Sequence, residues 1–192
     1  MRALPLSCAV MLLAAAGCSR RVEAPAEPRR SAIEVSAPGG ELTLVLAASE
    51  RGYALADRTG RRIGDVVIER DALRVLDPDG GVLSSVERRG DGFALRDHSG
   101  AVVLEAEATA AGHALSRPGG AAFGSRDPSG LVVGGHRIFA LLSGAYAQVL
   151  RDGDSVLEVR GLVDNSAASF LALSELPFPE RVALMLWMSE RA

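Results

Sequence analysis

The sequence contains no lysine, so all 21 of its basic residues are arginine, and it has only one asparagine and one glutamine. Aromatic residues make up 4% of the chain, and there are two cysteines, Cys8 and Cys18. Cys8 lies in an N-terminal apolar stretch that we expect to be removed. A mature chain with one remaining cysteine cannot build a disulfide framework, so a small disulfide-stabilised fold is excluded.

A short apolar run follows a single positive residue at the N-terminus. Arg2 precedes the run, which covers residues 9–17 and ends in small residues before Cys18. It is shorter than the roughly 20 apolar residues of a membrane-spanning helix, and its order is typical of a secretion signal. Ala15-Ala16-Gly17-Cys18 resembles the bacterial lipobox, although Ala15 stands where that motif usually has Leu. The resemblance implies a signal peptide over residues 1–17 and a diacylglycerol on the Cys18 thiol.

The sequence also fits a second cleavage site. Ala14-Ala15-Ala16 fits the A-x-A pattern of the ordinary signal peptidase, which would release a free periplasmic or secreted protein. Lipidation, however, explains the lone thiol of Cys18 in an oxidising compartment. The residue after Cys18 is Ser19, whereas an Asp at this position tends to retain such lipoproteins in the inner membrane. We therefore expect a lipid-anchored envelope protein, in the outer membrane, facing the periplasm or the cell surface.

Proline, alanine and charge dominate the segment after Cys18. Residues 19–32 show no apolar periodicity, so residues 18–32 are predicted to be the lipidated cysteine and a semi-extended tether. The tether carries +2, and without it and Arg2 the total of −3 becomes −6 for residues 33–192. An acidic domain argues against nucleic acid as a partner, because its binders neutralise phosphates with a basic surface.

The middle of the sequence repeats every 20 residues. The copies are Asp57-Arg58-Thr59-Gly60, Asp77-Pro78-Asp79-Gly80, Asp97-His98-Ser99-Gly100 and the degenerate Arg117-Pro118-Gly119-Gly120. Asp at the first position and Gly at the fourth are typical of a type I turn. Apolar and small or polar residues alternate on both sides of each turn, which predicts β-hairpins. A calcium loop is the alternative at 77–80, but calcium needs six to eight oxygens and no further carboxylate stands at the required spacing.

Further strands are predicted over 41–46, 131–133, 137–142, 146–150 and 155–159. The fold class is therefore mainly β, an antiparallel meander of about 12 strands built from 20-residue hairpin repeats. Residues 33–192 are predicted to form a single domain, since 160 residues suit one sizeable core.

The end of the sequence predicts a buried helix over 179–190. Pro179 and Glu180 suit a first helical turn, and Val182 to Met188 is apolar without a break. A helix that is apolar all round must be buried all round, and its length of about 18 Å is too short for a bilayer. We expect it to run through a closed or nearly closed, barrel-like sheet. A core plugged in this way argues against an internal cavity.

A strand meander followed by a buried C-terminal helix resembles the tubby C-terminal-like superfamily, which includes the LURP-one-related and scramblase-like proteins. The blocks Tyr53–Gly60 and Phe93–Gly100 resemble its strand-turn blocks, and Ser169–Ala172 followed by Leu176–Pro179 resembles its last strand and central helix. The phosphoinositide binding of tubby proteins does not carry over, because this domain is acidic and lacks lysine. The YD repeats of large bacterial shell proteins share the period, but their Tyr-Asp pair is missing.

No residue set predicts catalysis, a metal site or a cofactor. His98, His113 and His136 lack the short spacing of zinc ligands, and neither a nucleophile elbow nor a P-loop is present. We therefore expect a non-enzymatic, membrane-anchored lipoprotein that acts as a protein-interaction or structural module for an envelope partner. Binding of lipid or another hydrophobic ligand is the alternative, and a hydrolase with a dispersed site is a remote one.

Overall fold

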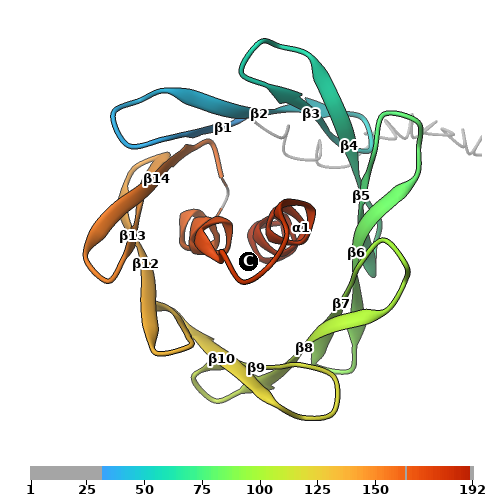
Figure 1. The fold of residues 1–192 in the computed structure, drawn as a ribbon, viewed down its shortest axis with the longest axis vertical. Coiled ribbons are helices and arrows are strands. Elements are labelled where there is room, and N and C mark those ends of the chain that lie inside the picture. The colour runs from blue at the N-terminus through green and yellow to red at the C-terminus, as the bar shows by residue number, and fades with distance from the viewer. Residues whose placement is uncertain (1–31, 163, 191–192) are drawn as a thin grey trace, which may run out of the picture.

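Every predicted turn joins two antiparallel strands in the computed structural model, which describes residues 32–162 and 164–190. The strands are β1 (Ile33–Ser36), β2 (Leu42–Ser49), β3 (Gly52–Asp57), β4 (Arg62–Ile68), β5 (Ala72–Leu76), β6 (Val82–Arg89), β7 (Gly92–Arg96), β8 (Val102–Thr109), β9 (Gly112–Ser116), β10 (Ala122–Asp127), β11 (Gly130–Val133), β12 (His136–Ser143), β13 (Tyr146–Arg151) and β14 (Asp154–Arg160). Each pairs with its neighbours in sequence, and β1 also pairs with β14, so the sheet closes into a barrel (Figure 1). The predicted mainly β meander is confirmed, with 14 strands rather than about 12.

The first strand closes the barrel, and its residues were not among the predicted strands. In β1, Ile33 and Val35 are buried while Glu34 between them is exposed, the alternation of a strand with one face on the core. Val35 lies opposite Val159 of β14 on one side and Leu44 of β2 on the other. Closure leaves the barrel without the two free edge strands of an open meander.

The two ends of the barrel differ, and we name them by their connections. At the repeat-turn end lie the turns at 57–60, 77–80, 97–100 and 117–120. At the entry end the chain enters the barrel at Ala32 and leaves it at Gly161, beside the short return turns such as 90–91. The turn of Asp127 falls at the entry end, because it comes half a period, one strand, after the last repeat turn.

A 14-stranded barrel is wide, and two helices fill it. Barrel diameter grows with strand number, and about eight strands already leave an interior that side chains alone can fill. Here α1 (Phe178–Ser189) and the 3₁₀-helix η1 (Asn165–Ala172) occupy the lumen as an antiparallel pair (Figure 1). Val182, Leu184 and Met185 are fully buried against the inward side chains of the wall. The predicted buried C-terminal helix is confirmed within one residue at each end.

The expected last strand over Ser169–Ala172 is wrong, because these residues belong to η1. A strand in the barrel wall exposes every second side chain, whereas Ala167 through Leu173 are all buried. Local hydrogen bonds favour the helix: the Asp164 carboxylate caps it by accepting the backbone N–H of Ser166 at 2.8 Å. The small side chains of Ala167 and Ala168 let η1 fit within the lumen.

The predicted signal peptide (1–17), the lipidation site Cys18 and the tether up to residue 31 lie outside the described residues. Within the described part of the chain, neither helix has the length and hydrophobicity needed to cross a membrane.

Candidate functional site

The aspartates of the repeat turns serve the turns themselves. Asp77 Oδ1 accepts the backbone N–H groups of Asp79 at 2.9 Å and Gly81 at 2.8 Å, and Gly80 takes the positive φ of +90° that the turn requires. Asp57 bonds in the same way, and the hydroxyl and N–H of Thr59 lower the pKa of its carboxyl. Among residues 32–162 and 164–190 no three His, Cys, Asp or Glu side chains cluster as metal ligands would. The prediction that these residues form turns is confirmed.

The three histidines lie in different surroundings. His98 sits in a repeat turn, and His136 at the same end approaches Asp152, with 2.6 Å between its Nδ1 and the carboxylate Oδ2. His113 lies at the opposite, entry end, where β9 begins. The fold therefore does not assemble them into one site.

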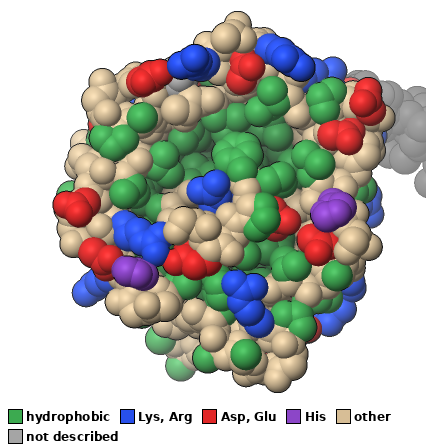
Figure 2. Space-filling view, in the orientation of Figure 1, with side chains coloured by type: hydrophobic (Ala, Val, Ile, Leu, Met, Phe, Trp, Pro, Cys, Tyr) green, Lys and Arg blue, Asp and Glu red, His purple; other side chains and the backbone are tan. Residues whose placement is uncertain are grey.

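An apolar pocket of about 380 Å³ opens at the repeat-turn end, between the barrel wall and the two inner helices. Figure 2 shows a hollow floored by hydrophobic side chains inside the ring at this end. The pocket lies within the range of about 300–1,000 Å³ that small-molecule sites occupy. Its lining residues come from β1, β2, β4, β14, η1 and α1, and are Val35, Thr43, Leu44, Ile63, Leu157, Leu171, Phe178 and Arg181. The pocket is a recess at this end of the barrel, and none of the residues Val182–Met188 lines it.

Arg181 is the single charged residue in the lining of this apolar pocket. Its Nη1 donates to the backbone carbonyl of Leu171 at 2.9 Å, and its guanidinium lies 5.7 Å from the centre of the Phe178 ring. Its Nε is buried and has no hydrogen-bond partner among the described residues. Burial lowers the pKa of Arg181, yet a guanidinium stays protonated in proteins. The pocket thus combines apolar walls with a cation that has an unused donor.

Glu180, the preceding residue, is buried to 4% exposure in the first turn of α1. Its Oε2 has no hydrogen-bond partner among the described residues. Burial raises the pKa of this carboxyl, and the nearby Asp97 carboxylate raises it further. Two adjacent charged side chains therefore each bury an unsatisfied polar atom at this end of α1, and buried polar groups are normally satisfied.

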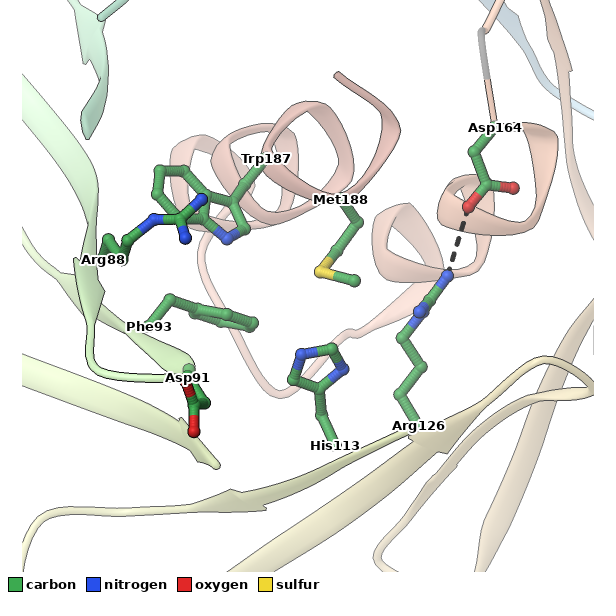
Figure 3. A pocket seen from close by; sticks show the side chains of 9 residues that line it. Arg88, Asp91, Phe93, His113, Arg126, Asp164, Trp187 and Met188 are labelled. Atoms are coloured by element: carbon green, nitrogen blue, oxygen red, sulfur yellow. Dashed lines mark hydrogen bonds and ion pairs between the residues drawn. The ribbon is translucent and has the colours of Figure 1, made fainter. Parts of the chain in front are cut away.

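A second, more polar pocket of about 310 Å³ lies at the entry end (Figure 3). The ring of Phe93 stands at its centre, 5.7 Å from the ring of His113 and 6.0 Å from that of Trp187. On the opposite side of the pocket Arg126 pairs with Asp164, with 3.2 Å between Nη2 and Oδ2, and also donates to Ser166 Oγ at 3.1 Å. Asp164 is therefore committed to an arginine rather than to His113.

His113 is the titratable group of the entry-end pocket that lacks a partner at one nitrogen. Its Nδ1 is buried without a hydrogen bond among the described residues. Burial lowers the pKa of its ring, and the positive charge of Arg126 lowers it further. The ring is therefore neutral at neutral pH. Among the described residues no Asp hydrogen-bonds to this nitrogen, as the aspartate of a Ser-His-Asp triad would.

Neither Arg181 nor Glu180 was singled out from the sequence as a site residue. The available signal was a pair of charged residues directly before an unbroken apolar run, in a helix expected to be buried on all sides. Such residues must either reach the end of the barrel or remain without partners inside it. In the structure both lie at the repeat-turn end, and each still has one buried atom without a hydrogen-bond partner among the described residues.

Comparison with known proteins gives no relative: no family model, no curated protein and no solved structure matches the chain. The resemblance to the tubby C-terminal-like superfamily therefore stays a prediction.

Proposed function

We propose that this protein is an envelope lipoprotein, anchored through Cys18, whose barrel binds the apolar chain of an anionic amphiphile in the pocket at the repeat-turn end. The observation that carries this proposal is the apolar pocket with Arg181 as the one charged residue of its lining. The ligand class follows from the chemistry of the lining: a hydrocarbon chain for the aliphatic walls and a carboxylate or phosphate for the guanidinium.

The walls suit a hydrocarbon chain because their surface is mostly aliphatic. Leu44, Leu171 and Val35 present aliphatic surface. The hydroxyl of Thr43 in the same wall already donates a hydrogen bond to the carbonyl of Val35 at 2.9 Å. A neutral polar ligand would therefore lose its hydrogen bonds to water without replacement, a cost that an apolar chain does not have.

Arg181 suits an anionic head group because of its position. It lies at the start of α1, at the open end of the barrel, where Phe178 reaches solvent. A ligand whose chain enters between the wall and the helices brings its head group to this guanidinium. A carboxylate or phosphate bound there would pair with the charge of the guanidinium.

The proposal is tested by titrating protein carrying Cys18→Ser, which needs no detergent, with the fluorescent fatty acid cis-parinaric acid. We expect saturable binding that Ile63→Trp weakens by filling the pocket. Arg181→Leu should weaken it about 10-fold or more, the equivalent of losing one charge-assisted hydrogen bond. The alcohol analogue of the probe, which has no charge, should bind Arg181→Leu as well as it binds the unsubstituted pocket.

Arg58→Leu is the matched control, since Arg58 lies at the same end, exposed and paired with Glu41. It should leave both probes unaffected. Absence of saturable binding, or binding that neither Ile63→Trp nor Arg181→Leu alters, would refute the proposal. Native mass spectrometry of the gently purified protein gives an independent check, since an endogenous amphiphile would appear as a discrete added mass.

Docking of an envelope protein, the first expectation from the sequence, keeps one supporting observation. The tip of the β12–β13 hairpin exposes two leucines, Leu141 and Leu142, at the entry end. An exposed apolar tip of this kind favours an interaction surface. The expectation that the protein is not an enzyme stays a prediction, and Cys18→Ser protein that hydrolyses acyl esters would overturn it.

A further inference from the structure

The hairpin of β12 and β13 extends beyond its neighbour on one side. β11 pairs with β12 only from Val133 to Leu131, which lies opposite Ile138. From Ala140 to Ser143, β12 is paired with β13 alone among the described strands. The last residues of this hairpin therefore extend past β11 at the entry end.

Both faces of this projecting tip are open to solvent. Leu141 is 51% exposed and Leu142 is 56% exposed. Consecutive side chains on a strand point to opposite faces, so exposure of both means that neither face is covered. Ser143, Gly144 and Ala145, which complete the tip, are exposed as well. We call residues 141–145 the leucine tip.

The leucine tip lies beside the place where the chain enters the barrel. The backbone N–H of Gly161 donates to the carbonyl of Ala145 at 2.9 Å. On its other side Gly161 lies directly against the carbonyl of Ala32, the first described residue. The end of the chain that leads back to Cys18 and the exposed leucines are thus neighbours, although they are more than 100 residues apart in sequence.

We propose that the leucine tip inserts into the surface of the membrane that holds Cys18, so that the barrel docks with its entry end toward the lipid. This inference rests on the lipid anchor of the proposed function. Cys18 and Ala32 are separated by at most about 50 Å even if the chain between them is fully extended. The anchor therefore keeps the tip within reach of the bilayer, and a contact too weak to hold a free protein becomes effective because it is intramolecular.

The strands beside the leucine tip carry side chains expected at a lipid interface. Tyr146 follows the tip, and the guanidinium of Arg160 lies 5.6 Å from the centre of its ring. Tyrosine is enriched at the head-group level of membranes, where one end of its ring is apolar and the other wet. Arginine at this level can contact lipid phosphates. Tyr146 lies opposite Ser143 and Arg160 opposite Tyr146, so this pair stands level with the turn, directly beside the exposed leucines, and adds head-group contacts to the same surface.

Docking in this orientation places the apolar pocket at the end of the barrel remote from the membrane. The repeat turns and Arg181 would then face the aqueous phase, and an amphiphile would enter the pocket from that side rather than directly from the bilayer that anchors the protein.

The test places a fluorophore next to the leucines. Lipidated protein with Ser143→Cys carries one free thiol, because the lipid occupies the sulfur of Cys18, and this thiol is labelled with an NBD dye. The protein is reconstituted into vesicles of phosphatidylethanolamine and phosphatidylglycerol that contain nitroxide-labelled lipid. We expect strong quenching by the nitroxide at position 143 and little at the matched position of Asp79→Cys, in a repeat turn at the other end.

Two variants separate insertion from simple proximity. Leu141→Glu/Leu142→Glu should leave the melting temperature unchanged, because both side chains are exposed, and should reduce the quenching at position 143 to the level at position 79. Val82→Glu, an exposed apolar residue of β6 at the other end, should leave the quenching intact. Arg181→Leu should also leave it intact, which separates docking from ligand binding in the pocket.

Equal quenching at positions 143 and 79, or quenching that survives the double glutamate substitution, would overturn the proposal. Protein that stays in the supernatant after reconstitution would overturn it too, since the anchor would then be missing. If a photo-crosslinker at position 143 in cells captures a protein rather than lipid, and vesicle quenching is absent, the tip is a protein-docking surface instead.

Discussion

Replacing the buried carboxyl of Glu180 by an amide should stabilise the protein at neutral pH. Glu180 is 4% exposed, and its Oε2 has no hydrogen-bond partner among the described residues. An unsatisfied buried acceptor costs about 1–3 kcal/mol, and more when it is charged. Glu180→Gln removes the charge while keeping the shape of the side chain. The amide still buries a polar group without a partner, so only the cost of burying the charge is removed, and we expect the free energy of unfolding at pH 8 to rise by about 1 kcal/mol.

The stabilisation by Glu180→Gln should increase with pH. Burial raises the pKa of Glu180 above its ordinary 4.5 in the folded protein. Well below pH 4.5 the group is protonated in both states, so no charge is buried. As the pH rises, the unfolded chain releases its proton first, so stability falls until the pH passes the raised pKa of the folded state. The advantage of Glu180→Gln should therefore be smallest near pH 4 and larger at pH 8.

The assay is urea unfolding followed by the fluorescence of Trp187, the one tryptophan in the sequence, which is 4% exposed and lies at the far end of α1. Glu107→Gln, on the exposed face of β8, is the matched control and should change stability by less than about 0.5 kcal/mol. Equal stability of Glu180→Gln and the parent protein at pH 8, or a difference of the same size at pH 4, would show that the carboxyl is solvated or paired.

Three further predictions address the core, the entry-end pocket and the anchor. Leu184 is fully buried in the lumen, so Leu184→Ala should cost about 2–5 kcal/mol in urea unfolding, and Leu184→Asp should abolish cooperative melting. The pKa of His113 is lowered in the folded state. Its contribution to stability is therefore present above its ordinary pKa of 6.5 and is lost as the pH falls through the lowered pKa. His113→Phe should flatten the pH dependence of the melting temperature over that window, and an unchanged profile would contradict this prediction. Cys18→Ala should move the protein from the membrane pellet to the soluble fraction, and an unchanged fractionation would contradict the lipid anchor.

Local signals in the sequence were sufficient for the strands and turns. The Asp-x-x-Gly period needs only the chemistry of four residues to make each turn, and alternation around Tyr53 or Phe93 needs only one buried face. The unbroken run from Val182 to Met188 was sufficient for α1, because it has no polar face to expose. These are properties of short segments, so they can be predicted without knowledge of the rest of the fold.

Other features depend on where distant segments meet. The assignment of Ser169–Ala172 to η1 depends on the room beside α1 in the lumen, which no property of those four residues reveals. The pockets exist because 14 strands enclose slightly more volume than two helices fill, a balance between residues spread over the whole chain.

The sequence by itself determined the hairpin repeat, the buried terminal helix and thereby the need for a barrel, since these follow from hydrogen bonding and hydrophobicity over a few residues. Only the tertiary structure decided that β1 closes the ring against β14, that Arg181 and Glu180 keep unsatisfied atoms beside an apolar pocket, and that Ala32 and Ala145 flank Gly161. Those relations depend on strand number, curvature and the volume of the lumen, which are properties of the assembled sheet and not of any segment within it.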